Sequence, residues 1–318
     1  MVKNGDPAAA EAETSESAFR ASLESYELRN CFVYYEDATL PTAVTLRNVN
    51  HSGNGNFTAT NYDLRTKTTT PSMTVVYDGI TYFNKAAVDA TVNMNIDNGE
   101  NMTIKLLDNL ARINALEVAV EGLVVLREDA YDLDLKFDSK KNAFSSLLSM
   151  VPGVYTKDFQ NIKTEGTLDF NGFVKGVYSE TQMPGFGVNL KVANAMFQYP
   201  GLPKAVTGIR ADMSISNPDG DLEKTLVDIR SFHADLGQNP IDAKMTLRGL
   251  ERITLNGDVN AKLNLEELTT MFPIEGTQLK GLFTIVANVS GVYDEARKSF
   301  PKVNALMSLT DGYACNAE

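Results

Sequence analysis

The 318-residue sequence predicts a mainly-β fold, a long curled antiparallel sheet accompanied by two short helices. Three observations support this prediction. Apolar and polar residues alternate with a period of two, turn-forming Gly, Pro, Asn and Asp residues separate the alternating stretches, and helical periodicity is scarce. Because alternation of this kind gives a sheet one dry face and one wet face, we expect the strands to pair antiparallel.

The alternating stretches begin at Phe19 and number about fifteen. The clearest hairpin joins 92–96 to 102–106, with alternating strands on either side of an Asp97-Asn-Gly99 turn. Further stretches follow the same pattern at 133–138, 168–170, 188–192, 213–215 and 245–247.

Two short segments predict helices. Residues 142–150 begin with a candidate N-cap, Asn142, and end before Pro152. Residues 264–271 begin with Asn264, carry Glu266 and Glu267 in the first turn, and end before a proline. Both helices are about two turns long and are too short to cover a long sheet.

A block in the middle of the chain recurs about one hundred residues later. The first copy contains LLSMVP at 147–152 and GTLDFNGFVKGVY at 166–178, and the second contains LTTMFP at 268–273 and GLFTIVANVSGVY at 281–293. A third echo pairs LPTAV at 40–44 with LPKAV at 202–206. Repetition of this kind predicts stacked, similar units.

The repeat divides the chain into a disordered linker at 1–18, a first β segment at 19–141, a second repeat at 142–263 and the start of a third at 264–318. The second copy stops before any counterpart of LPKAV, so we expect the chain to be a fragment of a longer array.

The shortage of helix poses a packing problem, because the apolar side of a sheet this large must be buried. Three solutions remain open at the level of sequence. A second sheet could pack against the first face to face, or the sheet could close into a barrel. Alternatively, the sheet could curl into a groove whose apolar inner surface is covered by a lipid.

Composition excludes several classes of function. The net charge of −12 argues against a nucleic-acid partner and against anionic membrane surfaces. Cys31 and Cys315 lie at opposite ends of the chain, so neither a disulfide nor a metal site is expected from them. The most apolar window, 115–126, carries two glutamates and is well short of the roughly twenty residues that span a bilayer.

Catalytic patterns are missing from the sequence. His51 and His233 lack ligand-spaced partners and are expected to be solvent-exposed or locally hydrogen-bonded. Asp132, Asp134 and Asp138 are expected to lie with Lys136 on a solvated strand face, and the 217–221 loop is interpreted as a turn. No nucleophile elbow or phosphate loop is present, so a hydrolytic enzyme is disfavoured and no cofactor or metal is expected.

Long segments of the chain resemble the AsmA family, most closely its members from Bacteroidota. The likeness extends over most of the chain, roughly residues 26–313, and it is carried by residues 26–49, 75–109, 113–126, 147–178, 183–206 and 232–250. The resemblance implies a repeating, taco-like β-groove in the periplasm, attached to the inner membrane by an N-terminal helix that we expect to lie outside this chain. It also implies that such a groove conducts phospholipid between the inner and outer membranes, or supports outer-membrane assembly.

The leading hypothesis is therefore a non-enzymatic lipid-binding groove whose partners are phospholipids or other acyl-chain lipids, with envelope protein partners left unknown. The residues expected to line it are Val92, Met94, Ile96, Ile104, Leu106, Leu135, Phe137, Leu168, Phe170, Leu190, Val192, Met213 and Ile215. The alternative is a structural scaffold of the cell envelope, built as a packed β-sandwich or solenoid. In that case the same residues are ordinary sheet core.

Overall fold

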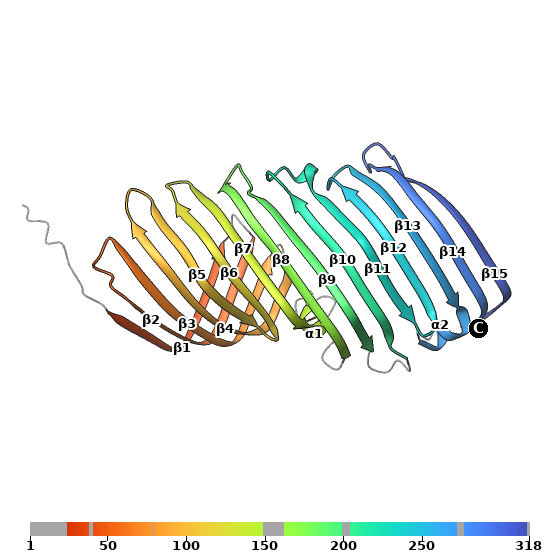
Figure 1. The fold of residues 1–318 in the computed structure, drawn as a ribbon, viewed down its shortest axis with the longest axis horizontal. Helices are drawn as coiled ribbons and strands as arrows, with labels where there is room; N and C mark the ends of the chain where they lie inside the picture. Colours follow the sequence, from red (N-terminus) through yellow and green to blue (C-terminus); the bar gives the residue numbers. More distant parts are fainter. Residues whose placement is uncertain are drawn as a thin grey trace, which may run out of the picture.

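A computed structural model describes residues 24–37, 41–77, 79–148, 162–198, 204–271 and 277–316. These residues form one antiparallel sheet of 15 strands in which each strand pairs with its neighbours in the sequence. β1 and β15 form the two edges and do not pair with each other, so the sheet is open (Figure 1). The predicted mainly-β, long antiparallel sheet is confirmed.

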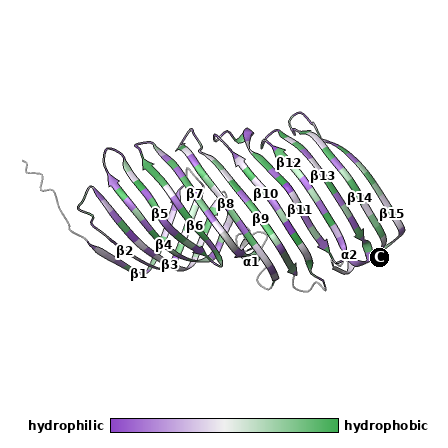
Figure 2. Ribbon diagram, in the orientation of Figure 1, coloured by the Kyte–Doolittle hydropathy of each residue, from purple (hydrophilic) through white to green (hydrophobic). Residues whose placement is uncertain are grey.

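The first seven strands are β1 (Ser25–Asp37), β2 (Thr42–Gly55), β3 (Asn61–Tyr77), β4 (Ile80–Asn98), β5 (Met102–Ile113), β6 (Leu116–Leu126) and β7 (Ala130–Ala143). The other eight are β8 (Lys163–Ser179), β9 (Gly185–Gln198), β10 (Val206–Asn217), β11 (Leu226–Leu236), β12 (Asn239–Arg248), β13 (Ile253–Asn264), β14 (Thr277–Tyr293) and β15 (Lys302–Asn316). Polar and apolar residues alternate along these strands (Figure 2), and the predicted hairpin is present as β4 and β5, with Ile96 opposite Ile104.

The strands are bent rather than straight, because β-bulges interrupt the pairing register of many of them. Several bulges contain a non-glycine residue with positive φ, namely Asn48, Lys85, Asp108 and Asn194. In each case the next residue is turned inward, and Ala195, for example, is only 1% exposed. The bulges therefore curl the sheet, and parts of the first strands pass behind β5–β7 (Figure 1).

The internal repeat is also a repeat of backbone conformation. Gly166 and Gly281 have φ values of 101° and 109°, and Gly176 and Gly291 have values of 127° and 136°. A side chain is disfavoured at such angles, which explains why both copies carry glycine there. The match means that β8 and β14 occupy the same place in successive units.

The two predicted helices are present with different boundaries. α1 runs from Phe144 to Leu148 and α2 from Leu265 to Met271. Asn264 caps α2 as predicted, since its Oδ1 accepts the backbone N–H groups of Glu266 and Glu267 at 3.1 and 3.2 Å. The prediction that Asn142 caps the first helix is wrong. Asn142 still belongs to β7, and its side chain bonds to the backbone of Glu117 on β6 instead.

The most compact part of the sheet is a cluster that we call the corner core. It brings together residues from β6, α1, β8, β9, β10 and β11 that lie on both sides of the bulges at Asn194 and Gly208. Its members are Leu116, Phe144, Leu168, Val192, Ala195, Val206, Ile209, Ala211 and Ala234. The bend thus brings apolar side chains of these strands together at the strand ends beside α1.

Some predictions fall on residues outside the described ranges. The linker at 1–18 and the prolines that follow the two helices belong to this group. The proposed boundaries at 141–142 and 263–264 remain predictions, and pairing between β7 and β8 and between β13 and β14 continues across them.

Candidate functional site: an apolar face along the sheet

Strand pairing assembles the predicted lining residues into rows that cross the sheet. In antiparallel pairs, residues directly opposite each other point to the same face. One row consists of Met94, Leu106, Gly122, Leu135 and Val174 on β4–β8. A second row consists of Phe170, Leu190, Met213, Ile229 and Met245 on β8–β12. We call this side of the sheet the apolar face.

All thirteen predicted residues lie on the apolar face, because the remaining ones are register partners or next-but-one neighbours of these rows. Their burial differs. Leu168 is 1% exposed, and Ile96 and Val192 are also buried, whereas Ile215 is 41% exposed. The half-buried residues are Val92, Met94, Ile104, Leu106, Leu135, Phe137, Phe170, Leu190 and Met213.

Further residues of the apolar face escaped the sequence analysis. Val120 and Val124 on β6 are register partners of Phe137 and Leu133 on β7. They lie in the window that was tested only as a membrane span, and their signal was hidden because β6 carries apolar residues on both faces. The alternation in the neighbouring strands could have revealed them.

Little secondary structure covers this face in the part of the chain that the structure describes. α1 packs on β7 and β8, and α2 packs on β13 and β14. No second sheet is present among these residues, so the face-to-face sandwich expected as one alternative is not formed there. The apolar face is consequently buried at the corner core and at Ile96, and most of the rest of it is half-exposed.

At the first strands the apolar face carries polar as well as apolar side chains, since Leu64 on β3 lies opposite Met94 and Thr66 lies opposite Val92. Tyr26, Gly53, Thr66 and Val92 are successive register partners, which places Tyr26 on this face. The Tyr26 hydroxyl lies 2.8 Å from His51 Nε2, and His51 Nδ1 lies 2.8 Å from Thr68 Oγ1. His51 is therefore locally hydrogen-bonded, as expected.

The opposite face carries most of the charged residues, and Leu110, Leu123 and Phe173 are also exposed on it. Lys175 Nζ donates to Asp134 at 2.7 Å, and this hydrogen bond holds the pKa of the Asp134 carboxyl below its ordinary value. A hollow of about 750 Å³ lies over β5–β9 on this face, with Lys136, Asp138 and Phe173 among its lining residues. Among the described residues, no group of three or more His, Cys, Asp or Glu is arranged to hold a metal.

The other two polar motifs also have local structural roles. The side chain of Asn217 bonds Gly220 N and Thr225 Oγ1, so the 217–221 loop is a turn as predicted. His233 lies 2.8 Å from Asp242 and 3.3 Å from Asp235. Cys31 and Cys315 are both free thiols.

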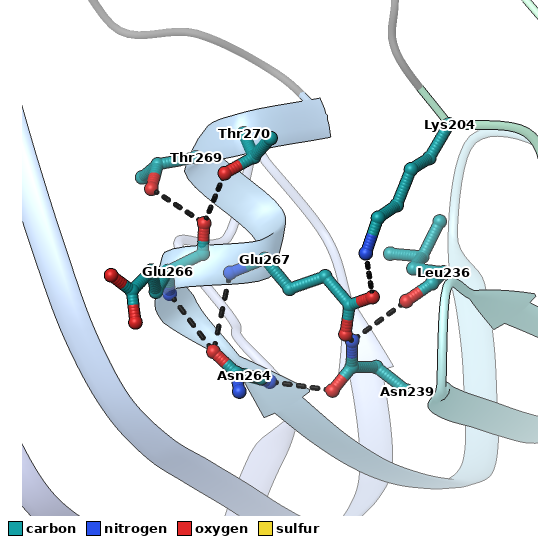
Figure 3. Close-up of polar contacts among 8 residues, drawn as sticks. All are labelled: Lys204, Leu236, Asn239, Asn264, Glu266, Glu267, Thr269 and Thr270. Atoms are coloured by element: carbon teal, nitrogen blue, oxygen red, sulfur yellow. Dashed lines mark hydrogen bonds and ion pairs between the residues drawn. The ribbon is translucent and has the colours of Figure 1, made fainter.

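A polar clamp attaches α2 to the sheet (Figure 3). Glu267 accepts hydrogen bonds from Lys204 Nζ and, at 2.7 Å, from Asn239 Nδ2. Asn239 Oδ1 in turn accepts the backbone N–H of Asn264 at 2.6 Å. One asparagine on β12 thus joins the end of β13 to the helix that follows it.

The fold and this face together define an open, single-layer β protein with one apolar and one charged side. Comparison of the chain with protein-family models, with curated proteins and with solved structures finds no match in any of the three. Within the described ranges, no helix is both long enough and apolar enough to span a membrane.

Proposed function

We propose that the apolar face binds the acyl chains of phospholipids and that the protein serves as a lipid-transfer groove of the cell envelope. One observation supports the proposal most. A continuous set of register-aligned apolar side chains crosses the sheet from β4 to β12 and stays half-exposed, and within the described ranges no second layer covers most of it. Exposed apolar surface of this extent typically marks a binding site for an apolar partner.

The mechanism is non-covalent. Each methylene that leaves water contributes about 0.8 kcal/mol to the binding free energy. A short stretch of acyl chain therefore binds without a hydrogen bond or ion pair to the protein. The headgroup remains in water at the open side of the curl. It does not reach the charged face, which lies on the other side of the sheet. The chain acts in this proposal as a binding surface and performs no chemistry.

The setting of this function is part of the same proposal. The resemblance to the AsmA family supports a periplasmic location, attachment to the inner membrane through a segment outside this chain, and a role between the two membranes. The net charge of −12 also favours a lipid over a nucleic acid as the partner.

Photo-crosslinking tests the proposal directly. The protein is incubated with a phospholipid that carries a photoreactive group near the end of its acyl chain, and native mass spectrometry detects lipid that co-purifies. We expect crosslinks on β8–β12 at Leu190, Met213 and their neighbours. Ile215→Asp places a charge on the apolar face at an exposed position, and we expect it to lower the crosslink yield about tenfold.

Ser216→Asp is the matched control, because Ser216 is the next residue of β10 and points to the opposite face. It should leave the yield unchanged. A folded protein with no co-purified lipid and no crosslink would contradict the proposal and favour the structural scaffold. If the crosslink yield fell equally in both variants, the added negative charge would explain the loss on either face, and the apolar face would not be the binding site.

A further inference from the structure

The charged face is hollowed at the same place in both copies of the repeat. The hollow of about 750 Å³ over β5–β9, which we call the first hollow, has a counterpart of about 690 Å³ over β10–β15, the second hollow. In both, an acidic and a basic residue face each other across equivalent strands, Glu121 with Lys136 and Lys244 with Asp258. The fold therefore builds a hollow of similar size in each copy.

The side chains that line the two hollows differ. Phe173 of the first hollow is replaced by Asn288 at the equivalent position of the second, since β8 and β14 are matching strands. Phe173 is 40% exposed, and Leu110 on β5 is 43% exposed in the same hollow. The first hollow thus presents an exposed aromatic ring where the second presents an amide.

The Phe173 ring is positioned by the strand beside it. Phe173 lies opposite Gly187 on β9, and a Cβ atom at Gly187 would be only 2.5 Å from the ring. The ring therefore rests against Gly187, and a larger residue there would displace it. The part of the ring that stays exposed is available for stacking on a ligand in the hollow.

Hydrogen-bonding groups of both kinds surround this ring. Asn171 and Asn189 are exposed and face each other, with Asn189 Nδ2 donating to Asn171 Oδ1 at 3.1 Å. Lys136 lies directly opposite Phe173 and supplies donors, and Glu121 lies opposite Lys136 and supplies acceptors. A ligand above the ring therefore meets donors and acceptors in the same hollow.

The charges of the first hollow disfavour two classes of ligand. The carboxylates among its lining residues outnumber the ammonium groups, and these charged residues are Asp108, Glu121, Asp134, Asp138, Lys136 and Lys175. The excess of negative charge disfavours a phosphate or a carboxylate. A cation stacked on Phe173 is disfavoured as well, because Lys136 already places a positive charge opposite the ring. A neutral ligand with one apolar side and several hydroxyl groups meets both conditions.

We propose that the first hollow binds a neutral oligosaccharide and that one of its pyranose rings stacks on Phe173. The C–H groups of a pyranose form an apolar side, and its hydroxyl groups both donate and accept hydrogen bonds. The volume of about 750 Å³ lies within the range of about 300–1,000 Å³ that is usual for small-ligand pockets. The site lies on the face opposite the acyl-chain site, so the inference does not depend on lipid binding.

Saturation-transfer NMR of the whole chain tests this with the neutral trisaccharides cellotriose, maltotriose and N-acetylated chitotriose. We expect at least one of them to bind, with the strongest transfer to C–H protons on one side of a sugar ring. Glucose 6-phosphate and choline serve as the anionic and cationic probes and should bind more weakly. Absence of binding by every trisaccharide, or tighter binding of either charged probe, would overturn the proposal.

Variants at equivalent positions of the two hollows locate the site. Phe173→Ala removes the ring and should weaken binding about tenfold, whereas Phe173→Tyr retains a ring and should bind as the wild type does. Asn288→Ala changes the matching position of the second hollow and should leave binding unchanged. Chemical denaturation establishes that each variant is folded. Binding that survives Phe173→Ala, or that falls equally in Asn288→Ala, would overturn the assignment to the first hollow.

The lipid and sugar sites are separated by a variant of the other face. Ile215→Asp should lower lipid crosslinking and leave sugar binding unchanged, because Ile215 lies on the apolar face. Failure of the proposed function would therefore appear in the crosslinking experiment alone, and failure of this inference in the sugar titration alone. Loss of sugar binding in Ile215→Asp would place the sugar on the apolar face and overturn the inference.

Discussion

α1 and α2 follow corresponding strands of the repeat, and different interactions attach them to the sheet. Phe144 of α1 is 7% exposed and belongs to the corner core. Residues 265–270 of α2 are half-buried or exposed, and this helix depends on the clamp of Lys204, Glu267 and Asn239. At the first repeat junction, after β7, an apolar side chain thus holds the helix on the sheet. At the second junction, after β13, polar side chains hold the helix.

Each junction also uses an asparagine to join two neighbouring strands. At the first, Asn142 at the end of β7 bonds to the backbone of Glu117 near the start of β6. At the second, Asn239 at the start of β12 bonds to the backbone N–H at the end of β13. Both copies of the repeat therefore keep an asparagine hydrogen bond between these two strands. In the first copy the asparagine lies on the second strand of the pair, β7, and in the second copy it lies on the first strand, β12. Four predictions test this contrast.

The largest effect is expected at the first junction. Phe144→Ala removes a buried ring from the corner core and should lower the free energy of unfolding by about 3–5 kcal/mol. Chemical denaturation measures the change. Phe173→Ala is the control, because Phe173 is 40% exposed on the charged face, and it should cost much less. Similar losses in the two variants would show that α1 does not close the corner core.

The asparagine of the same junction should come next. Asn142→Ala leaves the half-buried backbone N–H of Glu117 without its acceptor, which lies at 2.8 Å in the wild type. We expect a loss of about 1–3 kcal/mol and faster hydrogen exchange at the start of β6. A variant as stable as the wild type would mean that water replaces the asparagine there.

A smaller effect is expected at the helix cap of the second junction. Asn264→Ala removes the acceptor for two backbone N–H groups of α2 and should cost about 1 kcal/mol. Asn264→Asp retains a capping oxygen and should recover most of that loss. If both substitutions cost the same, the side chain of Asn264 acts through something other than the cap.

The smallest effect is expected from Glu267→Gln, because Lys204 is 46% exposed and solvent screens the pair. The hydrogen bond from Lys204, followed by that from Asn239, holds the pKa of Glu267 below its ordinary value of 4.5. The stability that this carboxylate contributes is therefore present above that value and is lost as the pH falls through the lower folded-state pKa.

The wild type should accordingly be more stable than Glu267→Gln at pH 7, and the difference should shrink as the pH falls below about 4.5. Thermal unfolding over a pH series measures this. A difference that is independent of pH would assign the role of Glu267 to packing and not to its charge.

The strand pattern and the second repeat junction show where sequence-based prediction succeeds. Period-two alternation predicted the strands and the β4–β5 hairpin, and it placed all thirteen predicted lining residues on one face, since neighbouring antiparallel strands keep the same alternation. Asn264 was recognised as a cap because capping depends on residues only two or three positions away. These features are local, and the sequence by itself determined them.

Only the tertiary structure decided which of those residues became core and which stayed half-exposed. Leu168 and Ile215 look equivalent in the sequence, yet they are 1% and 41% exposed. The difference depends on where the bulges bend the strands and on which side chains the bend brings together, as at Ala195 beside Asn194. Bending and burial depend on contacts between distant segments, which a period of two does not encode. For the same reason Asn142 was taken for a helix cap, although its partner, Glu117, lies on another strand.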